Sequence, residues 1–275
     1  MEQILSEAGL DHTVEAIGSD NLEQVLRSAV DAAPDLLIVL AGDGTAAAAA
    51  GLCGPDGPLL APLAGGTMNV LPHALYGPAA WPAALKQALQ DGMSLSVSGG
   101  MVDQKRFYVA AVLGGPALFA EAREAVRAGR VRLAWLKAQG ALSKAFSTRL
   151  CFQLEDAAMA RAEALALLCP LVSRAMANDE RALEAAALNP HGAAEAFRLG
   201  FRAMFSDIVG DWRTDPVVDT AKLRRGVAWA SSAIPAILDG EPMRLHRRVE
   251  IQFVERAFRA LTPRLREPAL PRPAR

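Results

Sequence analysis

The sequence predicts an α/β domain followed by a domain made mostly of β-strands. In the first third of the chain, helical and strand-like segments alternate, as in βαβ units around a parallel sheet. From about residue 95 onward, short strand-like segments separated by turn residues replace that alternation. We therefore expect an α/β domain over residues 1–93, a β domain over 94–265 and a loose proline-rich tail over 266–275.

Each element of the first domain follows from a local pattern. Apolar residues at helical spacing over 22–33 predict a helix, which Pro34 ends. The unbroken apolar run 36–40 is typical of a parallel strand covered on both faces. The same reasoning predicts a helix over 46–52, a strand over 58–63 and a helix over 81–90.

The second domain is predicted from shorter segments. Residues 248–253 alternate between polar and apolar types, as on a half-buried antiparallel strand. Strands are expected over 107–113, 149–154, 163–168, 182–188, 226–232 and 249–254, with helices at about 118–140 and 192–205.

Composition excludes several classes of protein. The 275 residues are 52% hydrophobic and 21% charged, which excludes a disordered chain. A formal net charge of -1 excludes a protein that binds nucleic acid through its overall charge. The three cysteines lack the spacing of a metal site. No run approaches the ~18 apolar residues of a membrane span, and the N-terminus lacks the basic flank of a signal peptide. We therefore expect a cytoplasmic protein with reduced cysteines.

The first candidate site directly follows the apolar run 36–40. Here Gly42-Asp43-Gly44-Thr45 ends a strand and opens a helix. Glycines let the backbone approach an anion closely, and the free N–H groups of a helix start, with the Thr45 hydroxyl, can bind phosphate oxygens. Phosphate repels the Asp43 carboxylate unless Mg²⁺ lies between them. A tight Asp-Gly turn with Thr45 as the helix N-cap explains this pattern equally well.

A second turn of the same kind follows the next predicted strand. Gly65-Gly66-Thr67-Met68-Asn69 comes directly before a helix expected to begin near Val70. The alternative is a left-handed turn that needs glycine, with Asn69 as a cap. Two glycine-threonine turns at the ends of adjacent parallel strands face one crevice, which favours the phosphate-binding interpretation.

The two turns, in this order and at this spacing, resemble the diacylglycerol kinase catalytic-domain family, which includes sphingosine kinases and bacterial lipid kinases. A third motif agrees: Leu238-Asp239-Gly240-Glu241-Pro242 resembles the D-G-E turn in the second domain of that family. Taken alone, Asp239-Gly240 indicates only a β-turn, with Glu241 on a solvated strand.

The resemblance implies a phosphofructokinase- and NAD kinase-like α/β domain, a C-terminal β-sandwich, and ATP with Mg²⁺ as cofactors. By position, Asp43 is the expected catalytic and Mg²⁺-binding residue, and Glu241 is the expected base for the hydroxyl of a lipid. The residues expected to bind the nucleotide are Gly42, Gly44, Thr45, Gly66, Thr67 and Asn69.

The implied reaction transfers the γ-phosphoryl group of ATP to a diacylglycerol-like or sphingoid lipid, a step of phospholipid metabolism. The expected partner is a lipid presented at a membrane surface, contacted peripherally from the cytoplasmic face, with its acyl chains between or inside the sandwich sheets.

Two alternatives stay open. G-D-G-T also occurs in NAD kinases, which phosphorylate a soluble dinucleotide. A non-catalytic lipid- or nucleotide-binding homologue is the other. The family's opening strand and N-x-x-S-G loop have no counterpart in this sequence, and Val70 to His73 stand where the family has D-F-A-R.

Overall fold

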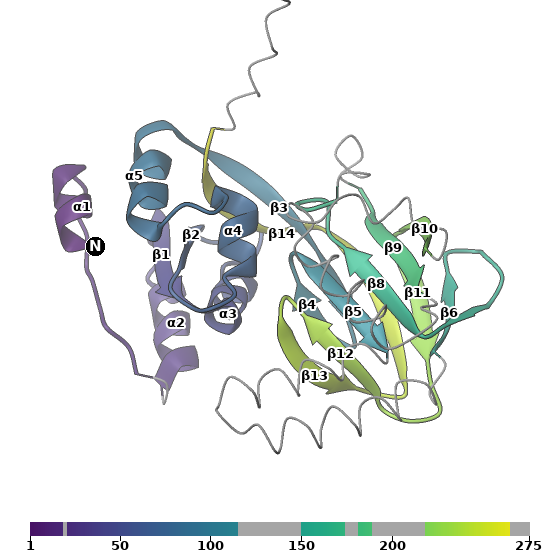
Figure 1. Ribbon diagram of the computed structural model, residues 1–275. Coiled ribbons are helices and arrows are strands. Elements are labelled where there is room, and N and C mark those ends of the chain that lie inside the picture. The colour runs from purple at the N-terminus through teal and green to yellow at the C-terminus, as the bar shows by residue number, and fades with distance from the viewer. Residues whose placement is uncertain (19–20, 115–149, 174–180, 189–217, 265–275) are drawn as a thin grey trace, which may run out of the picture. The chain divides into compact units, whose positions relative to one another are not determined.

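The computed structural model describes residues 1–18, 21–114, 150–173, 181–188 and 218–264, which are coloured in Figure 1. The chain divides into two compact units: unit 1 is Met1–Ser96 with Phe258–Arg275, and unit 2 is Val97–Ala257. The predicted helices at 118–140 and 192–205 and the predicted tail at 266–275 lie outside the described residues.

Unit 1 has the βαβ arrangement that the sequence predicts. Strands β1 (Leu36–Ala41) and β2 (Leu59–Ala64) are parallel and pair along their whole length, and helix α3 (Asp43–Cys53) connects them. Because the strands are parallel and in register, the segments that follow them leave the sheet at the same edge. The other helices of unit 1 are α1 (Glu2–Glu7), α2 (Leu22–Asp31), α4 (Val70–Tyr76) and α5 (Trp81–Asp91).

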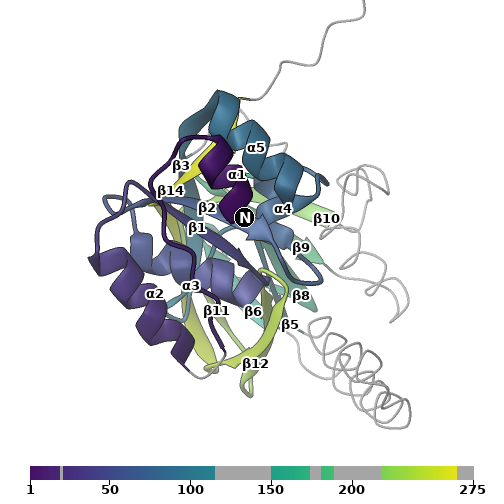
Figure 2. The ribbon, with the colours of Figure 1, turned by 90° about the vertical axis from the view of Figure 1, so that its left-hand side faces the viewer.

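The core of unit 1 holds the β1–β2 pair in place. Helices α1 and α5 pack together (Figure 2), and Leu5 of α1, Leu85 of α5 and Leu63 of β2 form one buried cluster. On β1 itself only Val39 is buried, and Leu40 is 39% exposed. The prediction that both faces of this run are covered is therefore wrong. Among the described strands β1 pairs with β2 alone, so it has fewer covering neighbours than an inner strand.

Unit 2 is built from two β-sheets, as its short strand-like segments predict. One sheet has the order β10-β9-β8-β5-β12-β13, and the other contains β14, β11, β6 and β7 in that order, with β3 joining β14 and β4. The strands are β3 (Gly92–Val102), β4 (Lys105–Phe107), β5 (Ala110–Gly114), β6 (Leu150–Leu154), β7 (Ala160–Ala162), β8 (Ala164–Leu168), β9 (Leu183–Leu188), β10 (Val218–Leu223), β11 (Arg225–Trp229), β12 (Ile234–Leu238), β13 (Glu241–Leu245) and β14 (Arg248–Pro263).

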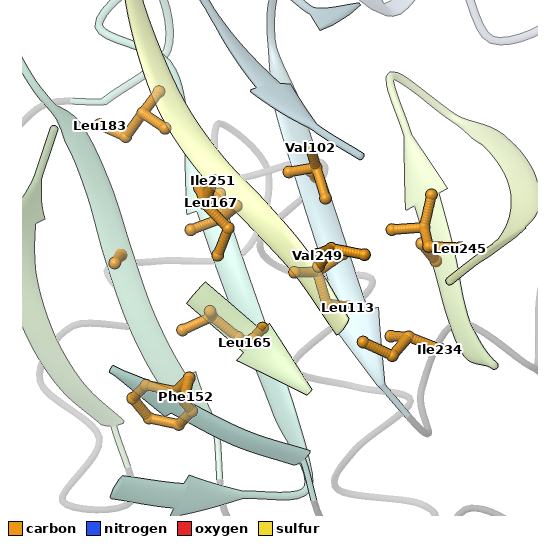
Figure 3. Close-up of a cluster of buried hydrophobic side chains, with 14 of the residues drawn as sticks. Val102, Leu113, Phe152, Leu165, Leu167, Leu183, Ile234, Leu245, Val249 and Ile251 are labelled. Atoms are coloured by element: carbon orange, nitrogen blue, oxygen red, sulfur yellow. The ribbon is translucent and has the colours of Figure 1, made fainter. Parts of the chain in front are cut away.

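Apolar side chains from both sheets fill the space between them (Figure 3). Leu113 and Leu165 come from one sheet and Phe152, Val249 and Ile251 from the other, and all five are between 0% and 5% exposed. Such a cluster stabilises the fold by about 1.5–3 kcal/mol for each large side chain. Protein side chains occupy the space between the sheets at this cluster.

The predicted strand over 107–113 is two strands. Strand β4 ends at Phe107 and β5 begins at Ala110. The N–H groups of the intervening Tyr108 and Val109 donate to the Asp239 carboxylate, at 2.6 and 2.8 Å, rather than to a neighbouring strand. The interruption therefore has a distant cause, which no local pattern could indicate.

The last strand also differs from the prediction. Strand β14 is 16 residues long, where the sequence predicts a strand over 249–254 only. Its first part belongs to unit 2, and its residues from Phe258 onward belong to unit 1. In unit 1, Ala260 pairs in parallel with Leu60 of β2. Unit 1 therefore contains a C-terminal segment that the predicted domain 94–265 assigns to the second domain.

None of the described helices has both the length and the apolar character that crossing a membrane requires.

Candidate functional site

The first glycine-rich turn passes directly from strand to helix. Strand β1 ends at Ala41, Gly42 is the N-cap of α3, and Asp43 is already the first helical residue. The helix thus begins three residues before the predicted start, and the alternative with Thr45 as N-cap is wrong. No side chain caps α3, and the first N–H groups of a helix have no partner within it. Gly44 is exposed and Thr45 half-buried, so an anion can reach this helix start.

The second turn is closed by the side chain of Asn69. This residue is the N-cap of α4 and has left-handed backbone geometry, with φ 52° and ψ 43°. Its Oδ1 accepts the Gly66 N–H at 2.8 Å, and its Nδ2 donates to the Gly66 carbonyl at 2.9 Å. Asn69 therefore holds the shape of the turn, while Gly65, Gly66 and Thr67 are exposed.

The two turns touch through their backbones. A Cβ atom added to Gly66 would lie 2.5 Å from the Cα of Gly42, and one added to Gly65 would lie 2.7 Å from the nitrogen of Ala41. Real Cβ atoms do not approach other atoms this closely, so the contact requires glycine at positions 65 and 66. The sequence-based expectation that these turns meet is confirmed, and the physical reason is the parallel, in-register pairing of β1 and β2.

Asp43 links the same two turns by a hydrogen bond. Its side chain is only 7% exposed, and its Oδ1 accepts the N–H of Leu71 in the first turn of α4 at 3.3 Å. Burial raises the pKa of the Asp43 carboxyl, while the N–H groups of Leu71, Val70 and Asn69 oppose that rise. The carboxylate faces the amide groups at the start of α4, but burial outweighs them and the pKa stays above its ordinary value.

The described residues do not form a magnesium site of their own. Among them, no three or more His, Cys, Asp or Glu side chains are grouped so that they could hold a metal ion. Asp43 is the acidic residue of the two turns, and its carboxylate already faces the amide donors of α4. Mg²⁺ in nucleotide sites is usually held by one or two carboxylates together with waters and substrate phosphates, so Asp43 would be the carboxylate that these turns offer to it.

In unit 2, the Asp239-Gly240 pair is a two-residue hairpin turn between β12 and β13. Leu238 pairs with Glu241, and both turn residues have positive φ, 46° and 91°. This is the geometry of a type I′ turn, which Asp-Gly suits. Glu241, the expected base, begins β13 and is exposed.

Asp239 anchors this turn through contacts that sequence reasoning missed. It is 4% exposed, and its carboxylate accepts three N–H groups. Oδ2 binds Tyr108 at 2.6 Å, and Oδ1 binds Val109 at 2.8 Å and Ala110 at 2.9 Å. The Asp239 N–H in turn donates to the Ala110 carbonyl at 2.9 Å. These four bonds fix the turn that presents Glu241, although the Asp-Gly pair alone indicates only a bend.

Comparisons with known proteins agree with this geometry. The family model of the diacylglycerol kinase catalytic domain matches residues 1–101, which include both glycine-rich turns. No curated protein matches the sequence closely enough to count as a relative.

Solved structures show the same fold over nearly the whole chain. A putative diacylglycerol kinase from Bacillus anthracis aligns with a TM-score of 0.67 and 16% identity, over 94% of this chain and 88% of that one. A second structure described in the same way gives 0.66 and 16%, over 95% and 89%. A third, described as a diacylglycerol kinase from the same organism, gives 0.63 and 15%, over 94% and 87%. At such identities the likeness establishes the fold alone. The α/β domain with a β-rich second part is thus confirmed, and so is the resemblance of this chain to the diacylglycerol kinase catalytic-domain family, whose family model covers residues 1–101.

Proposed function

We propose that the protein is a lipid kinase that transfers the γ-phosphoryl group of ATP to a hydroxyl of a diacylglycerol-like or sphingoid lipid. The backbone contact between Gly42 and Gly66 carries this proposal. It brings an uncapped helix start and an exposed glycine turn to one edge of the sheet, which is where α/β proteins bind phosphates. The match of residues 1–101 to the diacylglycerol kinase catalytic domain supports the same assignment.

Phosphoryl transfer depends chiefly on positioning and on neutralising the charge of the phosphates. In this proposal, the N–H groups of Gly44 and Thr45 and the Thr45 hydroxyl bind phosphate oxygens. Gly66 and Thr67 bind from the second turn. Asn69 holds that turn in shape through its two bonds to Gly66, so it acts on the nucleotide indirectly.

The acceptor hydroxyl needs a group that takes its proton. We assign this role to Glu241, because it is exposed and because the anchored Asp239-Gly240 turn fixes the backbone beside it. Mg²⁺, when bound, would neutralise phosphate charge, and Asp43 is the carboxylate of the two turns that would hold it.

The first test is an acceptor assay with radiolabelled ATP against diacylglycerol, a sphingoid base and NAD. We expect labelled lipid and no labelled NADP. Replacing Glu241 by Gln removes the base while keeping size, and it should lower turnover by about 10²–10⁴-fold. Glu255→Gln is the matched control, because Glu255 is exposed on β14, and it should keep full activity.

Three results would contradict the proposal. Labelled NADP without labelled lipid would identify an NAD kinase-like enzyme. Thermal stabilisation by ATP without any phosphorylated product would identify a non-catalytic nucleotide-binding protein. Equal turnover of Glu241→Gln and the wild type would remove Glu241 from the reaction.

Asp43→Asn separates the charge of this residue from its hydrogen bond. Asn keeps an oxygen that can accept the Leu71 N–H, so the fold should persist. Because Asn lacks the charge that would hold Mg²⁺, ATP consumption should fall at least about 100-fold. Asp35→Asn is the control, because Asp35 is exposed in the same unit. Unchanged turnover of Asp43→Asn would exclude the carboxylate from the mechanism.

The same variant tests the pKa of Asp43. A raised pKa in the folded state means that Asp43 contributes stability below the pKa of the unfolded chain, about 3.9, and that this contribution is lost as pH rises through the folded value. Asn is neutral at every pH. The free energy of unfolding of Asp43→Asn relative to the wild type should therefore be higher at pH 7 than at pH 3.5, measured by urea denaturation. The opposite order would mean that the pKa is lowered.

A further inference from the structure

The outer face of one sheet of unit 2 carries a row of arginine and tryptophan side chains. Neighbouring strands place Arg161 opposite Cys151, Cys151 opposite Trp229, and Trp229 opposite Arg248, so the row crosses β7, β6, β11 and β14. Successive side chains of a strand alternate between faces, and the neighbours Phe152, Ala228 and Val249 point into the core. The row therefore lies on the face turned away from the other sheet.

Further positive charges lie on the same face. On β11, Arg225 lies two residues before Val227 and four before Trp229, so all three share one face. Arg225 is exposed, as are Arg161 and Arg248. Arg106 on β4 pairs with Met101, whose neighbour Val102 is a core residue, so Arg106 shares the outer face. Glu250 on β14 is an exposed acidic residue of this face. The exposed Glu155 carboxylate also lies beside Arg225, whose backbone N–H it accepts at 2.9 Å, so four arginines stand against two acidic residues.

Apolar side chains lie among these arginines. The Arg248 guanidinium stacks over the Trp229 ring at 5.5 Å from its centroid. Trp229, Val227 and Met101 are half-buried, so part of each side chain meets solvent. Tryptophan and arginine together suit the boundary between lipid headgroups and acyl chains, where a ring enters the boundary and guanidinium groups meet phosphates.

We propose that this face, defined by Arg106, Arg161, Arg225, Trp229 and Arg248, docks the protein on an anionic lipid bilayer. Cationic side chains are attracted to the negative surface of such a bilayer, and the attraction adds over several arginines. A phosphate polymer such as DNA would use the charges but not the apolar side chains, so the bilayer fits the whole face better. The proposal extends the proposed function, since a kinase acting on a membrane lipid must reach the bilayer.

Vesicle co-sedimentation of the full chain tests this without measuring phosphoryl transfer. The probes are vesicles of pure phosphatidylcholine and vesicles with a third of phosphatidylglycerol. We expect binding to the second kind only, and loss of that binding in 0.5 M salt, because salt screens exposed charges. Arg161→Glu with Arg225→Glu should weaken the partition by at least about tenfold. Trp229→Ser should weaken it while leaving the charge unchanged.

The matched control is Arg27→Glu with Arg264→Glu, which changes the net charge equally at two exposed positions of unit 1. This control should bind the anionic vesicles like the wild type. The proposal is overturned if the wild type does not bind anionic vesicles, if both double variants bind equally, or if duplex DNA binds more tightly than the vesicles. Vesicle binding with no phosphorylated lipid would instead refute the proposed function and leave the docking face standing.

Discussion

Replacing Gly66 by alanine is expected to abolish the candidate nucleotide site. The new Cβ would lie 2.5 Å from the Cα of Gly42, and the atom it meets belongs to the backbone, so it cannot rotate away. One of the two turns must therefore move. A displacement of about 1 Å at such a site costs on the order of 100-fold in rate, and overpacking costs about 1–3 kcal/mol of folding free energy. Turnover of ATP and urea denaturation measure the two effects.

Gly42→Ala is the matched control for folding stability, because it tests the same contact from the other side. Its Cβ would lie 3.8 Å from the Cα of Gly66, an ordinary van der Waals distance. Gly42 also has extended backbone geometry, with φ -79° and ψ 173°, which alanine adopts without strain. The free energy of unfolding should therefore change by less than about 1 kcal/mol. If the two variants are equally stable, the backbone contact between the turns is not as the structure has it.

Asp239→Asn is expected to destabilise unit 2. Both carboxylate oxygens accept backbone N–H groups, so an Asn amide must point its own N–H groups at one of these donors. Leaving a buried amide unsatisfied costs about 1–3 kcal/mol, and more when the lost partner was charged. We expect the free energy of unfolding to fall by about 2–4 kcal/mol. Asn tolerates the left-handed backbone at this position, so the variant isolates the loss of the carboxylate.

Thermal denaturation with Asp156→Asn as the control measures this effect. Asp156 is exposed in the same unit, so its substitution should change the free energy of unfolding by less than about 0.5 kcal/mol. A midpoint for Asp239→Asn equal to that of the control would show that the three N–H bonds contribute nothing to stability. It would also remove the reason for treating this turn as a fixed support for Glu241.

The two turns of unit 1 could be predicted because local sequence specifies them. An apolar run followed by glycines and then by a helix pattern occurs twice in succession, around 36–45 and 59–70. Parallel strands joined by one helix must end at the same edge, so the meeting of the turns follows from topology alone. The sequence pattern predicts the start of α3 too late, because the Gly42 N-cap offers no side-chain signal.

The anchoring roles of two aspartates could not be predicted in this way. Asp43 binds a backbone group 28 residues away, and Asp239 binds one 131 residues away. Only the folded chain brings such partners together, and a single sequence contains no periodicity that connects them. The local motifs indicate a metal ligand at Asp43 and a bend at Asp239, and neither pattern indicates an anchor.

The local sequence pattern does not predict several strands of unit 2, because their residue types are unusual for strands. Strands β12 and β13 contain Pro235 and Pro242, and proline weakens the pattern by which strands are recognised. Strand β3 contains serine and glycine where strands usually carry β-branched residues. In these segments pairing with neighbouring strands outweighs local preference.

Backbone hydrogen exchange with and without a non-hydrolysable ATP analogue tests the central claim most directly. We expect the analogue to slow exchange in two peptides at once, one covering residues 42–45 and the other 66–69. Gly66→Ala should lose protection in both. Protection of one turn alone, or of neither, would contradict the claim that the two turns bind one nucleotide together.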